Sequence, residues 1–209
     1  MNTQTHLLLA LAAFSRRPRD ALAPASSPTV ELALLLGALL PDASLFVMWG
    51  QAKLAGIPEA RIWGELYYSD FWQASAAVTN SLPVFAALAL LAWVGGGRLL
   101  GERTTRLSSM LLAIAAGALL HVVTDLPLHH DDGHPHFWPV SDWIFSSPVS
   151  YWDPAHYGRA WSILEIALAA ALLLILWRRF RSLRVRVPLT LAALSYAVVA
   201  AYWTGQFGG

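Results

Sequence analysis

The chain contains no cysteine, and only 13% of its 209 residues are charged. Without cysteine, disulfides and thiolate metal sites are excluded, so any metal must be bound through nitrogen and oxygen atoms. A soluble domain usually carries about 25% charged residues, and this chain has too few to solvate a globular surface. What it has instead is 56% hydrophobic residues and a mean hydropathy of +0.50, which favours a membrane protein.

The apolar residues form blocks of roughly membrane-spanning length, separated by short polar connections. This pattern predicts an all-α fold, a polytopic membrane bundle of five to six helices. The blocks are 7–14, 30–49, 81–94, 107–123, 161–177 and 187–203. The sequence has no internal repeat and no low-complexity linker, so residues 1–209 are expected to form one membrane-embedded domain. A loop rich in histidine and aromatic residues is expected at 125–160.

The first block is followed, not preceded, by the basic cluster Arg16, Arg17 and Arg19. A signal peptide has the opposite order, although residues 21–23 resemble a cleavage site. We therefore expect a retained helix. Because it is short for a full span, a partly inserted helix covered by its neighbours is an alternative.

Arginine placement predicts the orientation in the membrane. The connections after blocks one, three and five are rich in arginine, namely Arg16, Arg17, Arg19, Arg98, Arg103, Arg106, Arg178, Arg179, Arg181, Arg184 and Arg186. The other two connections carry only Lys53, Arg61 and Arg159. Short loops rich in Lys and Arg stay in the cytoplasm. In a bacterial-type inner membrane, the 125–160 loop would then face outward, to the periplasm.

The stretch His121–Pro139 holds most of the ionisable chemistry, with histidines at 121, 129, 130, 134 and 136 and aspartates at 125, 131 and 132. His121 and Asp125 are spaced i, i+4 and therefore share one face of a helix. An ionisable pair inside an apolar helix is costly and by default indicates function. A plain His–Asp hydrogen bond within the bundle is the alternative.

Helix geometry places two further residues at the same level. With a rise of 1.5 Å per residue, His6 lies about 20 Å above Arg19 if the helix is continuous, Asp42 about 18 Å above Val30, and His121 about 21 Å above Leu107. All three reach the outer half of the bilayer. Singly, His6 could be an interfacial residue and Asp42 could start a helix broken by Pro41.

We predict that one metal ion is bound by His6, Asp42, His121, Asp125 and His129. The other loop histidines, His130, His134 and His136, are candidates for a second ion. From proximity in sequence alone, Asp131 or His134 is the candidate general base or acid. Glu165, in the fifth block, is expected to make a helix–helix hydrogen bond.

Several short motifs occur in a characteristic order: Thr5-His6, the stretch 37–42 (GALLPD), Thr79-Asn80-Ser81, His121-x-x-x-Asp125, and Gly133 leading to Phe137-Trp138-Pro139. Together they resemble the membrane-bound metal-dependent hydrolases, a family of multi-helix proteins that includes a bacterial inner-membrane protein linked to the SOS regulon. The pattern HxxxDxPxH at 121–129 is also similar to zinc-dependent phospholipase C and related nucleases, whose helices hold zinc with His and Asp.

One motif departs from the family, because Asn80 stands where the family has histidine in Thr-His-Ser. An amide binds divalent metals poorly. Either Asn80 supports the metal ligands without binding the metal itself, or one of His129, His130, His134 and His136 replaces the family's histidine as a ligand.

The resemblance implies a metal-dependent hydrolase at the outer face of the membrane, acting on a phosphoester or lipid. Imidazole and carboxylate ligands suit Zn²⁺, with Mn²⁺ or Fe²⁺ as alternatives. The expected partners are membrane lipids and an undefined small-molecule or lipid substrate, with no nucleic acid. The aromatic-rich stretch 137–152 would lie at headgroup depth, either touching substrate or anchoring the bundle.

Two other functions compete with hydrolysis. The protein could be a non-catalytic membrane protein with a structural or sensory metal site. Metal transport would require ionisable residues along a path to the other face, and the inner halves of the blocks offer mainly Glu31.

Overall fold

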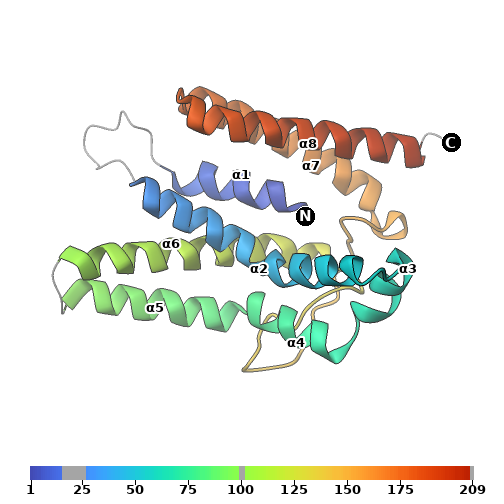
Figure 1. Cartoon of the computed structure of the whole chain (residues 1–209), viewed down its shortest axis with the longest axis horizontal. Coiled ribbons are helices and arrows are strands. Elements are labelled where there is room, and N and C mark those ends of the chain that lie inside the picture. The colour runs from blue at the N-terminus through green and yellow to red at the C-terminus, as the bar shows by residue number, and fades with distance from the viewer. Residues whose placement is uncertain (16–26, 99–101, 208–209) are drawn as a thin grey trace.

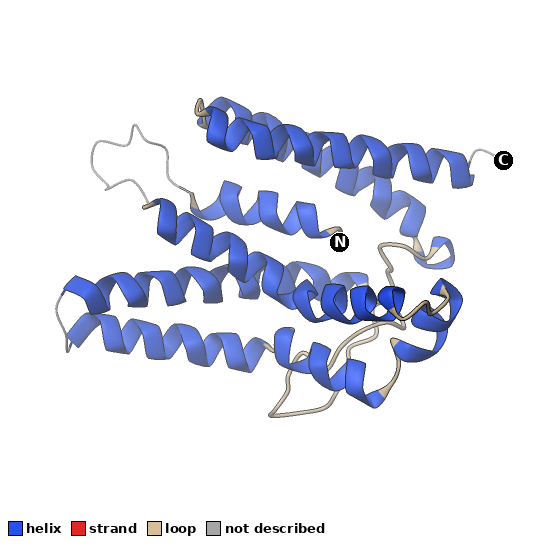
Figure 2. Cartoon of the chain, viewed as in Figure 1, coloured by secondary structure: helices blue, strands red, loops and turns tan. Residues whose placement is uncertain are grey.

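The computed structural model describes residues 1–15, 27–98 and 102–207. Its long helices lie side by side along one direction (Figure 1). The elements are α1 (Thr3–Phe14), α2 (Pro28–Leu54), α3 (Glu59–Arg61), α4 (Asp70–Thr79), α5 (Leu82–Arg98), α6 (Glu102–Asp125), α7 (Gly158–Arg179) and α8 (Leu183–Phe207). A π-helical turn (Ile62–Leu66) and 3-10 turns (Leu126–Leu128, Pro154–His156) complete them. No strand occurs in these ranges (Figure 2), which confirms the all-α prediction.

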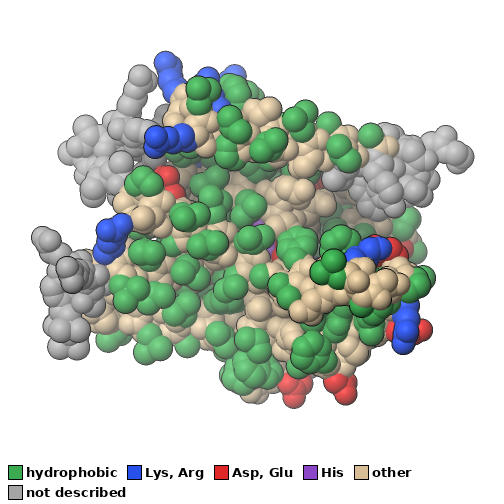
Figure 3. All heavy atoms as spheres, in the orientation of Figure 1, with side chains coloured by type: hydrophobic (Ala, Val, Ile, Leu, Met, Phe, Trp, Pro, Cys, Tyr) green, Lys and Arg blue, Asp and Glu red, His purple; other side chains and the backbone are tan. Residues whose placement is uncertain are grey.

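Four stretches of the described chain are long and apolar enough to cross a membrane: Pro28–Leu54, Asp70–Gly96, Thr105–Leu128 and Gly158–Arg179. Large apolar side chains are exposed on their outer surfaces, for example Leu91, Trp93 and Ile163. Figure 3 shows hydrophobic side chains across the middle of the molecule and charged ones towards its two ends. This distribution is what a bilayer requires, and it confirms the predicted membrane bundle.

The predicted polar connection between the second and third blocks is in fact partly helical. It contains α3, the π-helical turn and α4, and α4 and α5 form one apolar stretch with a break at residues 80–81. The Asn80 side chain donates to the Ala76 carbonyl at 3.0 Å, where α4 ends. The Ser81 hydroxyl accepts the N–H of Val84 at 3.1 Å, which starts α5. Short polar side chains that bond to nearby backbone favour such helix ends.

Helices α2 and α6 touch through their backbones at two glycines. A Cβ atom on Gly37 would lie 2.1 Å from the Ile114 carbonyl oxygen, and one on Gly117 would lie 2.2 Å from the Leu34 oxygen. Small residues permit this close approach of membrane helices. The contact lies on the α2 and α6 segments that lead to Asp42 and His121, so it brings these two side chains together.

Helix α1 has 12 residues and is about 18 Å long, shorter than the hydrocarbon core of about 30 Å. It contacts α2, α6 and α7, with Leu8 and Ala10 buried. The first block is thus a short helix covered by its neighbours, the second of the two alternatives. The basic cluster Arg16, Arg17 and Arg19 and the stretch 21–23 lie outside the described residues.

The connections between the predicted blocks alternate between the two ends of the bundle. The end of α1, the start of α2, the facing ends of α5 and α6, and the α7–α8 turn lie at one end, and the 126–157 loop lies at the other (Figure 1). Of the remaining arginines in the prediction, the side chains of Arg98 and Arg103 are also outside the described part. Which end faces the cytoplasm stays a prediction.

Candidate metal centre

Three helices bring ionisable side chains to one buried point. His121 and Asp125 lie on successive turns at the end of α6, and His6 lies on α1. The Nε2 atom of His6 is 3.5 Å from Asp125 Oδ1, and that of His121 is 4.0 Å from Asp125 Oδ2. One donor atom from each residue lies within 4.8 Å of the other two. Asp42 of α2 lies next to this group of three, with Oδ1 3.6 Å from His121 Nε2.

Both histidines use Nδ1 for contacts with the protein. His121 donates its Nδ1–H to the Ala38 carbonyl at 2.7 Å, and His6 Nδ1 is 3.2 Å from the Thr124 hydroxyl. The Nε2 atoms of both rings are buried and have no hydrogen-bond partner. Since a bond at one ring nitrogen sets the tautomer, the His121 lone pair is at Nε2.

The backbone around Pro41 is shaped by side chains from other helices. Pro41 has no N–H, so the Gly37 carbonyl loses its helical donor. The Pro41 carbonyl accepts bonds from the Thr79 hydroxyl and the Asn80 amide, both at 3.2 Å. Asp42 accepts a bond from the Thr3 hydroxyl at 2.5 Å. The Asn80 amide N–H thus supports the backbone next to Asp42, which agrees with the first of its two predicted alternatives. Its part in metal binding stays a prediction.

His129 lies between two carboxylates just beyond α6. Its Nε2 is 2.8 Å from Asp125 Oδ2 and its Nδ1 is 3.0 Å from Asp132 Oδ1. Burial alone would lower the pKa of His129, but the charge of Asp125, the hydrogen bond to that carboxylate and the nearby Asp132 raise it to about 10. The ring is therefore protonated at neutral pH. Asp132 also accepts the indole N–H of Trp152 at 2.8 Å. These bonds outweigh burial and lower the pKa of Asp132.

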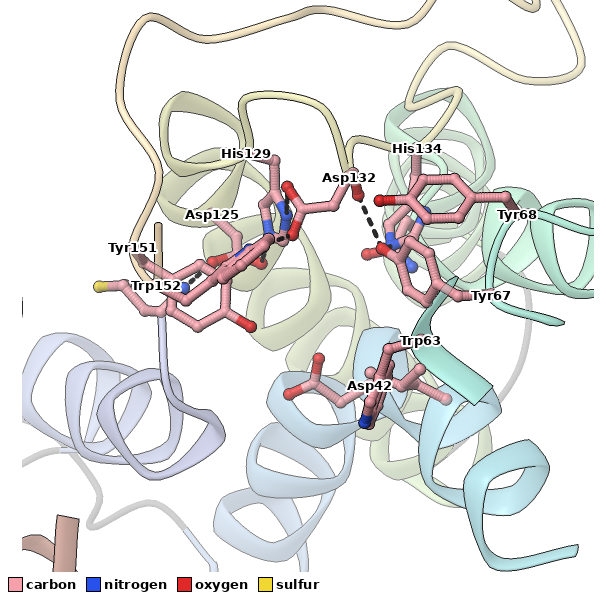
Figure 4. A pocket seen from close by; sticks show the side chains of 13 residues that line it. Asp42, Trp63, Tyr67, Tyr68, Asp125, His129, Asp132, His134, Tyr151 and Trp152 are labelled. Atoms are coloured by element: carbon pink, nitrogen blue, oxygen red, sulfur yellow. Dashed lines mark hydrogen bonds and ion pairs between the residues drawn. The ribbon is translucent and has the colours of Figure 1, made fainter. Parts of the chain in front are cut away.

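The centre opens into a cavity of about 390 Å³, within the range of small-molecule sites. Figure 4 shows Asp42, Asp125, His129 and Asp132 facing it, between aromatic residues on two sides. The lining residues include no Lys or Arg, and they are Met1, Asp42, Leu45, Trp63, Tyr67, Tyr68, Asn80, Asp125, His129, Asp132, His134, Tyr151 and Trp152. The amino group of Met1 pairs with Asp125.

The remaining predicted residues are placed differently. His134 lines the cavity near Tyr67, whose hydroxyl is 3.4 Å from His134 Nε2. Burial and the positive His129 lower the pKa of His134 to about 3, so its ring is neutral. His136 is buried, its Nδ1 has no partner, and the same two causes lower its pKa to about 4. Neither residue belongs to the group of three donors that lie within 4.8 Å of one another.

The cavity lining does not include five of the predicted residues, namely His6, His121, His130, Asp131 and His136. His130 turns away, bonding the Ser147 carbonyl at 2.6 Å and stacking on His156 with ring centroids 3.5 Å apart. Asp131 is exposed, whereas its neighbour Asp132 lines the cavity. The sequence analysis missed this role of Asp132. Its i, i+3 spacing from His129 was a usable signal.

These observations define an integral membrane protein whose helices enclose a candidate His/Asp metal centre beneath an aromatic cavity. A family model described as YdjM inner membrane protein matches residues 1–206. The chain therefore belongs to the YdjM inner membrane protein family, which confirms the predicted inner-membrane location. No curated protein and no solved structure matches the chain significantly.

Proposed function

We propose that this protein is a metal-dependent hydrolase of the inner membrane, with its metal ion held by His6, Asp42, His121 and Asp125. One observation carries the proposal: the buried Nε2 atoms of His6 and His121 lack partners and lie beside Asp125. A buried polar atom without a partner is costly. A cation bound between these atoms would supply the missing partner.

The donor set fits a small divalent cation. Around a tetrahedral ion with bonds of 2.0–2.1 Å, donor atoms lie about 3.3 Å apart. The separations of 3.5 Å from His6 to Asp125 and 3.6 Å from His121 to Asp42 are close to that value, and the 4.0 Å from His121 to Asp125 would shorten when a metal binds. Nitrogen and carboxylate donors favour Zn²⁺, with Mn²⁺ or Fe²⁺ as alternatives.

Access to the centre favours catalysis over a structural role. A structural zinc site is closed by its protein ligands, whereas a catalytic one keeps a position open to substrate. Here Asp42 and Asp125 both line the cavity, and the Asp42 side chain is 20% exposed. When bound, the metal would lower the pKa of a water molecule and polarise the scissile bond.

Two residues of the chain, His129 and Asp132, are placed to deliver a proton to the centre. Nε2 of the protonated His129 points towards the centre, and its Nδ1 lies 3.0 Å from Oδ1 of Asp132. We assign His129 as the acid that protonates the leaving group, with Asp132 orienting the ring. Asp131 is exposed, and the low pKa of His134 makes it a weak base.

A phosphoester of a membrane lipid is the substrate class that we propose. Trp63, Tyr68 and Trp152 line the cavity and are each between 41% and 49% exposed, as befits aromatic residues at headgroup depth. No lining residue is Lys or Arg, so the metal, His129 and the Met1 amino group would balance the phosphate charge. The resemblance to zinc-dependent phospholipase C supports the same chemistry.

The test is elemental analysis of the purified protein in detergent, combined with assays of phosphoester and phospholipid hydrolysis. We expect about one metal ion per chain, lost in His121→Ala and Asp125→Ala and kept in the matched control His130→Ala. Metal-dependent turnover should disappear with the metal. Wild-type protein without stoichiometric metal would refute the proposal. Metal without turnover would favour the structural or sensory alternative.

A further inference from the structure

Glu165 is a carboxylate buried in the middle of α7. It is 2% exposed and lies within one of the stretches apolar enough to cross a membrane. It accepts the backbone N–H of Asn2 at 2.7 Å, the Asn2 side-chain amide at 3.0 Å and the Thr5 hydroxyl. A carboxylate in an apolar helix is costly unless it is bonded in this way. All three of these bonds go to the start of α1.

Glu165 acts as an N-terminal cap supplied by another helix. Asn2 precedes α1, but its side chain makes no cap bond to its own helix. The Glu165 carboxylate instead accepts the N–H of Asn2 and places a negative charge at the positive end of α1. The position of the first turn of α1 therefore depends on α7.

Helix α7 also holds the other end of α1. Arg179 donates from Nη1 to the carbonyls of Leu11, Ala12 and Ser15 at 3.1, 2.9 and 2.9 Å. The distance from Glu165 to Arg179 along α7 is about 21 Å, and the distance from Asn2 to Ser15 is about 20 Å. The two helices run in the same direction (Figure 1). Two opposite charges of matched spacing thus fix α1 along its axis.

The axial position of α1 determines where His6 lies. Thr5, which is bonded to Glu165, precedes His6 directly, and Thr3 is bonded to Asp42. A slip of one residue would move His6 by about 1.5 Å, whereas ligand distances tolerate about 0.2 Å. Helix α7 itself contributes none of the donors proposed for the centre.

We infer that Glu165 is a positioning residue of the metal centre: through Asn2 and Thr5 it sets the place of His6 Nε2 relative to His121 and Asp125. The inference rests on the proposed function, since it requires that the centre binds metal. Glu165 contacts no metal donor and acts only through α1.

The first test compares Zn²⁺ affinity, measured by chelator competition, in full-length Glu165→Ala, Glu165→Gln and Ser162→Ala. Ser162 is the matched control because it is one turn away on α7 and its hydroxyl donates only to Gly158 of the same helix, at 2.9 Å. We expect a loss of tenfold or more for Glu165→Ala, a smaller loss for Glu165→Gln, and none for Ser162→Ala. If circular dichroism and size-exclusion chromatography show that Glu165→Ala does not fold, the comparison of Glu165→Gln with Ser162→Ala decides the test.

The second test asks whether Glu165 acts through His6. In a His6→Ala background, Glu165→Ala should cause no further loss of affinity, and the visible spectra of the Co²⁺-loaded single variants should match. Wild-type affinity in the folded Glu165 variants, or full additivity with His6→Ala, would overturn the inference while leaving the metal site in place. Absence of metal binding by the wild-type protein would instead remove the proposed function, and the inference with it.

Discussion

The imidazole rings of His6 and His121 stack with their centroids 3.6 Å apart and an interplanar angle of 12°. They come from different helices, and each has a buried Nε2 without a partner. Two protonated rings this close would repel each other, so the pair suits neutral imidazoles that share a cation.

Removing metal should destabilise the protein. A ligand at 100 times its dissociation constant stabilises the folded state by about 2.7 kcal/mol, so a chelator should lower the melting temperature in detergent. His121→Ala should melt at the chelator-treated temperature with or without Zn²⁺. His130→Ala, altered in a ring that stacks on His156 outside the cavity, should respond to Zn²⁺ as the wild type does. A chelator-insensitive wild type would contradict this prediction.

Gly37→Ala should disrupt the contact between α2 and α6. The added Cβ would lie 2.1 Å from a backbone oxygen of Ile114, so the helices must separate, at a cost of about 1–3 kcal/mol. Metal content should fall too, because Asp42 and His121 would move apart. The control is Gly50→Ala, on the same helix with nothing within 4 Å of its Cβ, which should be neutral or slightly stabilising. Equal melting temperatures for the two variants would argue against the close contact.

Asn80→Ala should lower the stability of the protein but leave its metal content unchanged. The substitution removes hydrogen bonds to the Pro41 and Ala76 carbonyls, worth about 1 kcal/mol. The Thr79 hydroxyl still donates to Pro41, so that carbonyl keeps a partner. Denaturation and elemental analysis check the two halves of this prediction. Loss of the metal in a folded Asn80→Ala protein would show that the amide is a ligand after all.

Substitution of the exposed aromatic residues that line the cavity should weaken substrate binding more than catalysis. Trp63→Ala and Tyr68→Ala should raise KM for a phospholipid several-fold with little change in kcat, because neither side chain touches the His/Asp centre. Trp93→Ala is the control, since Trp93 is 68% exposed on α5 and does not line the cavity. If all three variants behave alike, the aromatic residues anchor the bundle without contacting substrate.

The centre should open to the periplasm. The helix ends that flank the arginine-rich connections lie at the opposite end of the bundle from the 126–157 loop (Figure 1), and basic loops remain cytoplasmic. A reporter that is active only in the periplasm should therefore be active when fused at the C-terminus, and a cytoplasmic reporter should not. The reverse pattern would place the centre on the cytoplasmic side.

The helical part of the site could be predicted because helices are regular. A constant rise per residue predicted one level for Asp42 and His121, and their side-chain atoms lie 3.6 Å apart. The level of His6 was counted from Arg19 along a continuous helix, whereas α1 ends at Phe14. His6 nevertheless lies beside His121 and Asp125. The predicted helix–helix hydrogen bond of Glu165 is also confirmed, although its partners on α1 could not be named. The spacing of residues along a helix gives their depth in the membrane, but it does not show which helices are neighbours.

The directions of the side chains in the 126–157 loop could not be predicted, because a loop, unlike a helix, has no regular repeat along the chain. His129 and His130 are consecutive, yet one faces Asp125 and the other faces Ser147. Asp131 is exposed and Asp132 is buried for the same reason. Helix α4 was missed because its polar and aromatic residues are typical of a connection, and its packing depends on contacts with α2 that are remote in sequence.

The hydrogen bonds by which α7 holds both ends of α1 in place have a consequence for biogenesis. During synthesis His6 leaves the ribosome well before Glu165 and Arg179, which bind the two ends of its helix. In the proposed metal site, the donor that is made first is thus positioned last. A partly inserted chain would lack the contacts that place His6, so the proposed function implies that metal is bound late, by the assembled bundle.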